Sequence, residues 1–514
     1  MEKETEQRLR RQSFFRMIFS RTVITILLLL LNFLWLFSLL FELFEGITLV
    51  FGGVVAATAV MLIIILNSDD DPAFKLSWCI VVAVLPLFGI VLYTIVRFDL
   101  GSRVHQKMLK KSVEASLPHL PAACDLAGQC DPQTAAIAQY LQNCAHAPAY
   151  TNTDVQYFPL GEDKFEEMIR QLKQAKRFIF LEYFIVVPGQ MWGQILEVLA
   201  QKAKEGVEIR VLYDGMNAVA NLPQDYPKQL EKLGIRCKLF SPVRPFISTH
   251  YNNRDHRKIL VIDGHTAFTG GINLQDRYIN QETVYGHWKD TAIMVQGEAA
   301  KGFTLLFLQM WNATEQTADY ASYLQSIPAK PAPGLVIPYG EDPTGKERVA
   351  KTVYLHILNQ AQRYVYIMTP YLILDAEMSN ALQYAAKRGV DVRIILPHIP
   401  DKRTAFALAK SHYRELTGAG VKIYEYTPGF VHAKVFLSDD TCGVVGSINL
   451  DYRSLYLHYE CAAYLYKVPA LADINADFAD TFAKSHPVTA EDVRKQSLLS
   501  RMVAAVLKVA APLM

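Results

Sequence analysis

The chain has 514 residues, enough for two or three domains of ordinary size. Its formal net charge is only +2, which argues against a dedicated nucleic-acid binder, because such proteins usually carry a strongly basic face. The seven cysteines form no C-x-x-C pair, so we expect neither a zinc site nor a disulfide framework and interpret them as mostly free thiols.

Three apolar runs stand at the front of the chain, and they account for most of its high hydrophobic content of 51%. They extend from Val23 to Phe41, from Ile47 to Leu66 and from Ser77 to Val96. Each is close to the roughly 20 residues that a helix needs to cross a bilayer. A cleaved signal peptide is disfavoured because a second run follows the first at once. We therefore expect transmembrane helices within residues 1–100 and a juxtamembrane connector over residues 101–150.

The flanking charges of these runs give conflicting signals about orientation. Basic residues precede the first run and follow the third, whereas the turns between runs carry acidic residues. The positive-inside rule then places both flanks in the cytoplasm, which three complete crossings cannot do. The number of crossings and the side of the N-terminus therefore stay open. We expect the large C-terminal part to be cytoplasmic and the chain to be a multi-pass membrane protein.

Beyond the connector, strand-like and helix-like segments alternate. A run of β-forming residues at 177–186 is followed by a helical stretch at 193–206 and a second strand at 207–213. Such alternation is typical of βαβ units. It predicts an α/β fold with mainly parallel or mixed sheets flanked by helices.

Similar sequence segments recur about 180 residues later in the same order. The segment 364–373 repeats the character of the first strand, and 385–396 repeats the strand that follows it. We therefore expect two similar halves, at 151–326 and 335–490, joined by a proline-rich linker. The remaining segment, 491–514, is apolar with spaced basic residues, which leaves open whether it lies on a membrane surface or docks on the body.

Each half contains one copy of a His-x-Lys-x4-Asp motif, followed after six residues by Gly-x-Ile-Asn. The first copy comprises His256, Lys258, Asp263 and Asn273, and the second comprises His432, Lys434, Asp439, Ser447 and Asn449. From His to Asn the spacing is 17 residues in both copies. One isolated His-x-Lys is worth little, but two complete copies at matching places in duplicated halves make a strong signal.

Side chains alternate between the two faces of a strand, so each histidine and its lysine should point to the same face. Asp263 and Asp439 have the opposite parity, which suggests that they support the site rather than react. Two histidines, two lysines and two asparagines suit a phosphate ester. Lysine and asparagine can stabilise phosphoryl oxygens, while one imidazole attacks phosphorus and the other protonates the leaving alcohol. No carboxylate-rich metal site is evident, and we expect no cofactor.

These paired motifs resemble those of the phospholipase D superfamily, and the similarity extends over nearly all of residues 150–514. It is closest to bacterial cardiolipin synthases, on the strength of Asn449-Leu-Asp-Tyr-Arg-Ser454, of Tyr459-Glu460, and of Leu181-Glu182-Tyr183. The apolar segment from Leu76 to Tyr93 is similar to the membrane region of the same enzymes.

The resemblance implies a two-step transfer of a phosphatidyl group between two phosphatidylglycerol molecules. A phosphohistidine intermediate forms, glycerol leaves, and cardiolipin is the product. By analogy, His256 is the nucleophile and His432 is the general acid and then the general base. Asn273, Ser447 and Asn449 would bind the substrate phosphate. Glycine at 271 stands where the second half has Ser447, so only one half offers a hydroxyl.

The same resemblance suggests residues that orient the histidines. Asp290 and Glu460 follow the motif asparagines by 17 and 11 residues, at places where superfamily members use acids for this purpose. Glu182, on the first strand, is a third candidate. For all three, a purely structural role stays open.

Several alternative functions remain. A hydrolytic phospholipase D or a phosphatidylserine synthase would differ only in the acceptor that resolves the intermediate. A nuclease-type phosphodiesterase is disfavoured by the membrane segment and the weak net charge. A catalytically inactive scaffold is disfavoured because both motif copies are complete. The sequence leaves acyl preference and oligomeric state open.

Overall fold

The computed structural model describes residues 47–97, 100–120, 126, 128–242, 253–315, 318–325 and 330–513, with a few residues between 26 and 37. The chain divides into two compact units. One comprises Met1–Val104, Val243–Tyr251 and Lys508–Met514, and the other comprises His105–Pro242 and Asn252–Leu507. The second unit thus contains both of the similar halves that the sequence predicts.

The described part of the first unit includes the helices α3 (Ile47–Leu66), α4 (Pro72–Val84) and α5 (Pro86–Arg97). In the described ranges, no helix combines the length and the apolar character that crossing a membrane requires. The expected run from Val23 to Phe41 lies largely outside the described residues. The run from Ser77 to Val96 was expected as one helix but is divided between α4 and α5. The break falls at Leu85, because a residue before proline is disfavoured in the helical conformation.

Few side chains of this unit are buried. Ile65, Val82 and Tyr93 form a small core, and the rings of Trp78 and Tyr93 meet edge to face at 5.3 Å. Many large apolar side chains are instead exposed, among them Val55, Val60, Ile63, Ile64, Leu66, Leu76 and Val84. The end of the chain packs here too, since Ser77 Oγ donates a hydrogen bond of 2.6 Å to the carbonyl of Val509.

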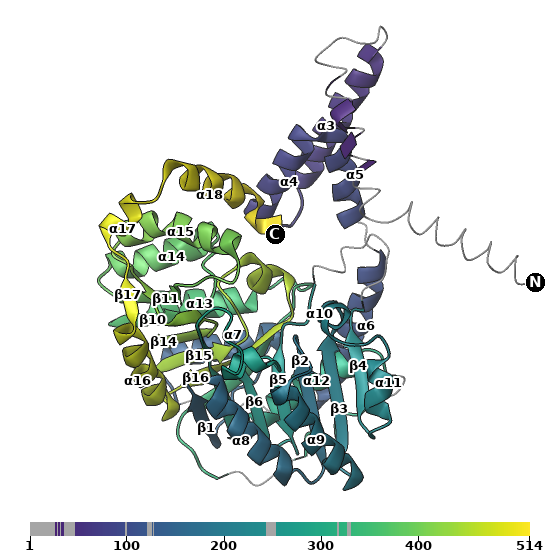
Figure 1. Ribbon diagram of the computed structural model, residues 1–514, viewed down its shortest axis with the longest axis vertical. Coiled ribbons are helices and arrows are strands. Elements are labelled where there is room, and N and C mark those ends of the chain that lie inside the picture. The colour runs from purple at the N-terminus through teal and green to yellow at the C-terminus, as the bar shows by residue number, and fades with distance from the viewer. Residues whose placement is uncertain are drawn as a thin grey trace, which may run out of the picture. The chain divides into compact units, whose positions relative to one another are not determined.

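The first half of the second unit is a mixed sheet with the strand order β1-β8-β6-β5-β2-β3-β4 (Figure 1). Only the pairs β2–β3 and β3–β4 are parallel, and the other pairs are antiparallel. The strands are β1 (Thr153–Phe158), β2 (Phe178–Tyr183), β3 (Glu208–Asp214), β4 (Arg236–Phe240), β5 (Lys258–Ile262), β6 (Thr266–Gly270) and β8 (Ala292–Gly297). The sheet is therefore mixed rather than mainly parallel.

The second half repeats this order as β9-β16-β15-β14-β10-β11-β12, with β17 added at the edge. Again only the pairs β10–β11 and β11–β12 are parallel. The strands are β9 (Leu335–Glu341), β10 (Tyr364–Met368), β11 (Asp391–Pro397), β12 (Lys422–Tyr426), β14 (Val435–Ser438), β15 (Cys442–Gly446), β16 (Glu460–Tyr466) and β17 (Ser485–Pro487). Both motif strands, β5 and β14, occupy the same central place in their sheets.

Helices flank both sheets, as Figure 1 shows. Those of the first half are α8 (Gly161–Gln174), α9 (Gln190–Lys204), α10 (Gly215–Asn221), α11 (Tyr226–Glu231) and α12 (Ala300–Asn312). Those of the second half are α13 (Val349–Gln360), α14 (Ala376–Lys387), α15 (Arg403–Gly418), α16 (Ala470–Ala483) and α17 (Ala490–Arg494). Before the first half come α6 (Leu100–Ser116) and α7 (Pro132–Ala145), and the chain ends with α18 (Leu498–Ala510).

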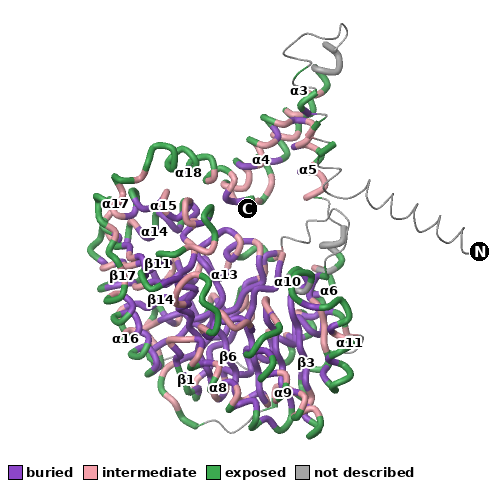
Figure 2. Tube along the Cα trace, in the orientation of Figure 1, coloured by how far each residue is buried: buried purple, intermediate pink, exposed green. Residues whose placement is uncertain are grey.

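Alternating residues of β2 enter different cores. Ile179 and Leu181 pack with side chains of α8 and α9, whereas Phe178 and Phe180 pack with α12. The core around α12 also takes in side chains from β10, β14 and β16 of the other half. Buried residues therefore run continuously through the middle of this unit (Figure 2). Burying apolar area between the halves is the main force that keeps them together.

Short backbone pairings also cross between the halves. Strand β13 (Gly429–Val431) pairs in parallel with β7 (His287–Lys289), and Asp255 forms a parallel bridge with Tyr459. Each of these pairings stands directly before a motif histidine in one half and reaches the matching segment of the other half.

The motif aspartates occupy turns at the far end of the motif strands. Asp263 and Asp439 both have a φ of 55°, in the left-handed region. The Asp263 carboxylate accepts hydrogen bonds of 2.7 to 2.9 Å from three successive backbone N–H groups, at Lys176, Arg177 and Phe178. Asp439 accepts from Gln362, Arg363 and Tyr364 at 2.7 to 2.8 Å. Each aspartate thus ties the start of the neighbouring strand, β2 or β10, to its own motif strand.

We expect Asp439→Ala to destabilise the protein by roughly 2–4 kcal/mol, because it leaves three N–H groups without their acceptor and places alanine at a left-handed φ. Asp439→Asn keeps one acceptor oxygen and tolerates that conformation, so it should be intermediate. Thermal unfolding in detergent measures both. Asp480→Ala, which removes an exposed helix pair with Lys484, is the control and should leave the midpoint unchanged. Equal midpoints for Asp439→Ala and wild type would contradict this role.

Candidate active site

The two motif histidines stand just before the central strands β5 and β14. His256 and His432 are each 7% exposed, and Lys258 and Lys434 are each 1% exposed. Each lysine ammonium donates a short hydrogen bond to the backbone carbonyl of its own motif histidine. The Lys434 Nζ atom also lies 2.9 Å from His432 Nδ1. Histidine and lysine of each motif therefore share a face, as their two-residue spacing predicts.

Each histidine is held by a carboxyl group from the opposite half. His256 Nδ1 lies 2.8 and 2.9 Å from the two Glu460 oxygens, and His432 Nδ1 lies 2.6 Å from Asp290 Oδ2. Backbone hydrogen bonds also join each histidine to the opposite half. His256 N donates to the Tyr459 carbonyl at 2.9 Å, and His432 N donates to the Lys289 carbonyl at 2.7 Å. With Nδ1 engaged, each ring keeps its Nε2 for a substrate.

Burial controls the protonation of the four motif side chains. It lowers the pKa of Lys258 to about 8 and that of Lys434 to about 7. Burial, followed by the charge of Lys434, lowers the pKa of His432 to about 4. Burial also lowers the pKa of His256 well below its usual range, and the charges of Lys258, Lys434 and His432 act in the same direction. Groups of one motif thus act on groups of the other, so the two motifs form one site with neutral imidazoles.

The two motif asparagines differ in their surroundings. Asn273 has partners at both ends of its amide, because its side-chain oxygen accepts from Ile185 N at 3.1 Å and its Nδ2 donates one proton to the Tyr278 hydroxyl at 2.7 Å, which leaves its second Nδ2 proton. Asn449 is 5% exposed, and among the described residues its Oδ1 has no hydrogen-bond partner. A buried amide oxygen without a partner costs free energy unless a ligand or water satisfies it.

The serine predicted to contact phosphate is engaged elsewhere. The Ser447 hydroxyl donates a short hydrogen bond to Glu460 Oε2, and it accepts from Cys461 N at 3.1 Å. In the first half the matching residue is Gly271, where a Cβ atom would lie 2.1 Å from Asp290 Oδ1. The shorter Asp290 comes so close to the backbone that only glycine fits, whereas the longer Glu460 leaves room for a hydroxyl. The two halves thus support their histidines with different pairs, Gly271–Asp290 and Ser447–Glu460.

The third predicted support, Glu182, is fully buried but does not face a motif histidine. Its Oε1 lies 3.8 Å from the Arg257 guanidinium, and it neighbours Asp255. Burial, followed by the charge of Asp255, raises the pKa of Glu182 well above its usual range. The three groups form a buried cluster beneath the motif strand.

Four aromatic residues around the histidines were not singled out as site residues from the sequence. Phe184 lies edge to face with His256 at 5.0 Å between ring centroids, and Tyr278 and Trp288 lie 5.4 and 5.3 Å from His432. His458 lies 5.5 Å from His256. Trp288 and His458 are each two residues before a supporting acid, Asp290 or Glu460, and strand alternation would have placed them on the same face.

One group of described residues has the composition of a cation site. Ligand atoms of His256, His458 and Glu460 lie within 4.8 Å of one another. The charges of Lys258 and Lys434 act on the same histidine, so a further cation there would be repelled. The residues therefore suit an anion better than a metal ion.

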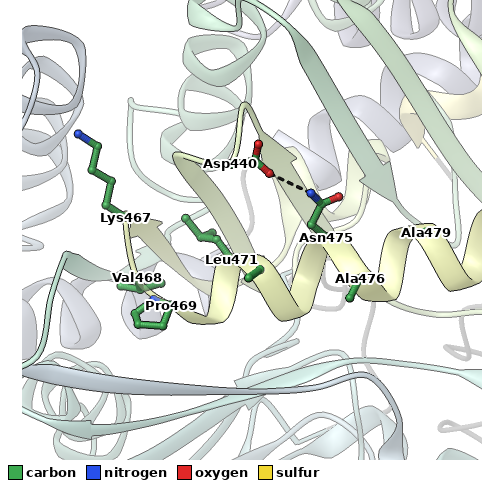
Figure 3. Close-up of a pocket in the computed structure, with 9 residues that line it drawn as sticks. Asp440, Lys467, Val468, Pro469, Leu471, Asn475, Ala476 and Ala479 are labelled. Atoms are coloured by element: carbon green, nitrogen blue, oxygen red, sulfur yellow. Dashed lines mark hydrogen bonds between the residues drawn. The ribbon is translucent and has the colours of Figure 1, made fainter.

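An open pocket of about 690 Å³ lies along α16, next to the turn between β14 and β15 (Figure 3). It is lined by Asp440, Lys467, Val468, Pro469, Leu471, Ala472, Asn475, Ala476 and Ala479. Asn475 Nδ2 donates to Asp440 Oδ1 at 2.9 Å. No motif histidine, lysine or asparagine lines this pocket, so it is separate from the reacting groups.

We expect that the Gly271–Asp290 pair can be replaced by a serine–glutamate pair only when both residues are changed together. We expect Gly271→Ser and Asp290→Glu each to lower the unfolding midpoint, since either change alone crowds the Asp290 position. Together they rebuild the arrangement of Ser447 with Glu460, so the double variant should recover about 1–2 kcal/mol relative to the sum of the single losses. A double-mutant cycle of thermal unfolding measures this coupling. Strict additivity would show that the two positions are independent.

Known proteins with similar sequences agree with this fold and this site. A family model described as cardiolipin synthase, phospholipase D-like domain, matches residues 168–311 and 354–482, and an N-terminal phospholipase D-nuclease model matches residues 56–97. The chain is 32% identical to a cardiolipin synthase of Halalkalibacterium halodurans, over 92% of this chain and 94% of the relative. It is 33% identical to cardiolipin synthase 2 of Bacillus anthracis, over 86% and 87%.

Two further similarities bear on the chain. An uncharacterised protein of Streptococcus mutans is 52% identical, over 87% of this chain and 98% of the relative. Among solved structures, phosphatidylserine synthase of Haemophilus influenzae matches with a TM-score of 0.55 at 18% identity, over 74% of this chain and 98% of that one. At that identity the match concerns the fold alone. Taken with the cardiolipin synthases that align over nearly their whole length, the duplicated site shows that this chain belongs to the cardiolipin synthase family of phosphatidyltransferases, within the phospholipase D superfamily.

Proposed function

We propose that this chain makes cardiolipin by transferring a phosphatidyl group from one phosphatidylglycerol to another, with release of glycerol. The observation that carries the proposal is the pair of buried, neutral histidines, each backed by a carboxyl group of the other half and accompanied by a buried lysine. A neutral imidazole is a competent nucleophile, and a second one nearby can carry the proton that the leaving alcohol requires.

In the first step, His256 Nε2 attacks phosphorus of the donor phosphatidylglycerol. The bond from phosphorus to the glycerol oxygen breaks as His432 gives that oxygen a proton, so glycerol leaves and a phosphatidyl-histidine remains. This assignment of the two roles follows the resemblance of the motifs to those of the family. The anionic phosphate of the donor favours the charged imidazolium, so His432 takes up a proton when the donor lipid binds.

In the second step, the neutral His432 takes the proton from a terminal hydroxyl of the second phosphatidylglycerol. That oxygen attacks phosphorus, the bond to His256 breaks, and cardiolipin is released. The proton accounting closes, because His432 gives one proton in the first step and recovers one in the second. His432 is then ready for another donor molecule.

The other motif residues stabilise charge. The ammonium groups of Lys258 and Lys434 lie in a poorly solvated site, where each acts more strongly on phosphoryl oxygens than it would in water. Asn273 and Asn449 add neutral amide groups. Ser447, Glu460 and Asp290 position the histidines, and Asp263 and Asp439 secure the strands.

We also propose that the protein works at the bacterial inner membrane, with its catalytic part on the cytoplasmic side. The exposed apolar side chains of α3 and α4 support this, because water-exposed clusters of that size are unfavourable in a soluble monomer. Helix α18 supports it too, since Leu498, Leu499, Met502, Val503 and Val506 are all exposed. Several crossings and a surface-bound α18 are part of this proposal.

The alternatives differ in the acceptor. A hydrolytic phospholipase D would resolve the intermediate with water, and a phosphatidylserine synthase with serine. Neither water nor serine carries a phosphate, whereas a second phosphatidylglycerol does. Only the phospholipid acceptor would therefore bring a second phosphate to the basic residues near the site. A nuclease is disfavoured by the small net charge of +2.

The first experiment incubates the full-length protein, extracted with detergent from carbonate-washed membranes, with phosphatidylglycerol and follows the lipids by mass spectrometry. Cardiolipin and glycerol should appear in equal amounts. His256→Ala and His432→Ala should each lose at least about a thousandfold in rate, because each removes a reacting group. Because His432 acts in both steps, His432→Ala should form the phosphatidyl adduct slowly and then retain it, whereas His256→Ala should form none.

The matched control is His265→Ala, a partly buried histidine of the first half outside the site, which should keep full activity. Phosphatidic acid as the sole product would disprove the synthase assignment. Recovery of the protein in the soluble fraction would disprove the membrane location. An adduct in His256→Ala but not in His432→Ala would reverse the two roles.

The lysine pKa values predict a fall of kcat/KM at alkaline pH. The active form carries charged lysines. In the free enzyme the pKa is about 7 for Lys434 and about 8 for Lys258, so both lysines are mostly charged only below about pH 7. The rate should therefore decline as pH rises through about 7 to 8 and deprotonates them. In Lys434→Arg the guanidinium stays charged, so the alkaline limb should move to higher pH. A profile of kcat/KM that stays flat to about pH 9 would contradict this electrostatic role.

A further inference from the structure

The proposed reaction sets a requirement that the two motifs alone do not meet. The acceptor phosphatidylglycerol carries its own phosphodiester, and in cardiolipin this second phosphate is joined to the reacting one by a single glycerol. While the reacting phosphate occupies the two motifs, the acceptor phosphate must lie one glycerol length away. The site should therefore offer a second group of anion-binding side chains close to the histidines.

His458 is a buried polar side chain next to the reaction centre that the mechanism does not use. Its ring lies 5.5 Å from that of His256, and the residue is 8% exposed. Among the described residues neither of its ring nitrogens has a hydrogen-bond partner. Its Nδ1 is 3.9 Å from Glu460 Oε1, beyond hydrogen-bond distance. Two unsatisfied ring nitrogens at this depth indicate a ligand that supplies their partner.

Basic side chains surround this imidazole. His458 N donates a hydrogen bond of 2.8 Å to the carbonyl of Arg453, and the next residue, Tyr459, donates one of 2.8 Å to the carbonyl of Arg254. After burial, the charge of Arg453 is the largest influence lowering the pKa of His458, followed by Lys258, Arg254 and Lys402. Neutral His458 can therefore donate a hydrogen bond from one nitrogen without adding repulsion.

Among the described residues, no acidic group of this region pairs directly with Arg453, although the charge of Asp451 acts on it. Asp214 lies 3.3 Å from the Arg254 guanidinium, and Asp451 accepts a hydrogen bond of 2.8 Å from Ser454 N. In the described part of the chain, no carboxylate lies within 4.0 Å of the half-buried Arg453 guanidinium. Burial lowers the pKa of Arg453 most, the charge of Asp451 opposes this lowering, and the charge of Arg254 adds to it. A bound anion would therefore offset part of the remaining cost of burying this guanidinium.

We propose that Arg453 and His458 form a subsite for the phosphodiester of the acceptor phospholipid, with Arg254 and Lys402 adding positive potential. This subsite proposal rests on the proposed function. It explains why the enzyme would prefer a phospholipid as the acceptor. Water, glycerol and other simple alcohols lack the phosphate that this subsite would hold, so only a phospholipid acceptor gains its binding energy. A guanidinium suits the role because it can donate two parallel hydrogen bonds to one phosphate.

The test compares two acceptors in one reaction. Full-length protein in mixed micelles receives phosphatidylglycerol together with deuterated glycerol, and mass spectrometry follows cardiolipin and deuterated phosphatidylglycerol. Both products come from the same phosphatidyl-histidine, but only cardiolipin requires an acceptor phosphate. In Arg453→Gln the ratio of cardiolipin to deuterated phosphatidylglycerol should fall roughly 10- to 100-fold, the usual effect of losing a charged hydrogen-bond partner. His458→Phe, which keeps ring size without a donor, should shift the ratio in the same direction.

Arg393→Gln is the matched control, since Arg393 is also half-buried but pairs with Asp391 on β11. Its product ratio should equal that of wild type. If Arg453→Gln lowers both products equally or changes neither, the subsite assignment is wrong while cardiolipin synthesis by wild type still stands. If wild type exchanges glycerol but makes no cardiolipin, the proposed function itself has failed.

Discussion

The whole arrangement depends on one interaction made twice: a motif histidine of each half bonded through Nδ1 to a carboxyl group of the other half. These bonds, at 2.8 Å to Glu460 and 2.6 Å to Asp290, orient both rings and leave Nε2 available. Neither half could position its own histidine alone. The apolar core around α12, which takes side chains from both sheets, therefore serves chemistry as well as stability.

The sequence was sufficient to predict the duplicated α/β architecture because its signals are local. Alternating strands and helices, repeated phrases and the spacing of the motif are all readable along the chain. The mixed sheet was harder, because β5 and β14 enter antiparallel to β2 and β10 without a distinct sequence signal. Asp290 and Glu460, which the family resemblance suggested as orienting acids, lie beside His432 and His256.

Contacts between residues that are far apart in the sequence could not be predicted from it. Ser447 looked like a phosphate ligand because serine is polar and sits in the motif, yet its hydroxyl bonds Glu460. The reason is a length difference of one methylene between Glu460 and Asp290, which decides whether serine or glycine fits opposite. Glu182 was similarly placed on the right strand, but its partners are Arg257 and Asp255 rather than a histidine. Such choices depend on which side chains meet across the interface.

The electrostatics of the site follow from the same burial. Burial lowers the pKa values of Lys258, Lys434 and both histidines, and the charges of the two lysines add to this effect at the histidines. Keeping such charges together is costly in the free protein, and an anion reduces that cost. A substrate with one phosphate at the two motif lysines would relieve only part of it, because Arg453, Arg254 and Lys402 also act on the neighbouring His458. A site with this distribution of charge would gain most from two phosphates held one glycerol apart, which is the arrangement that the proposed donor and acceptor, and cardiolipin formed from them, would present.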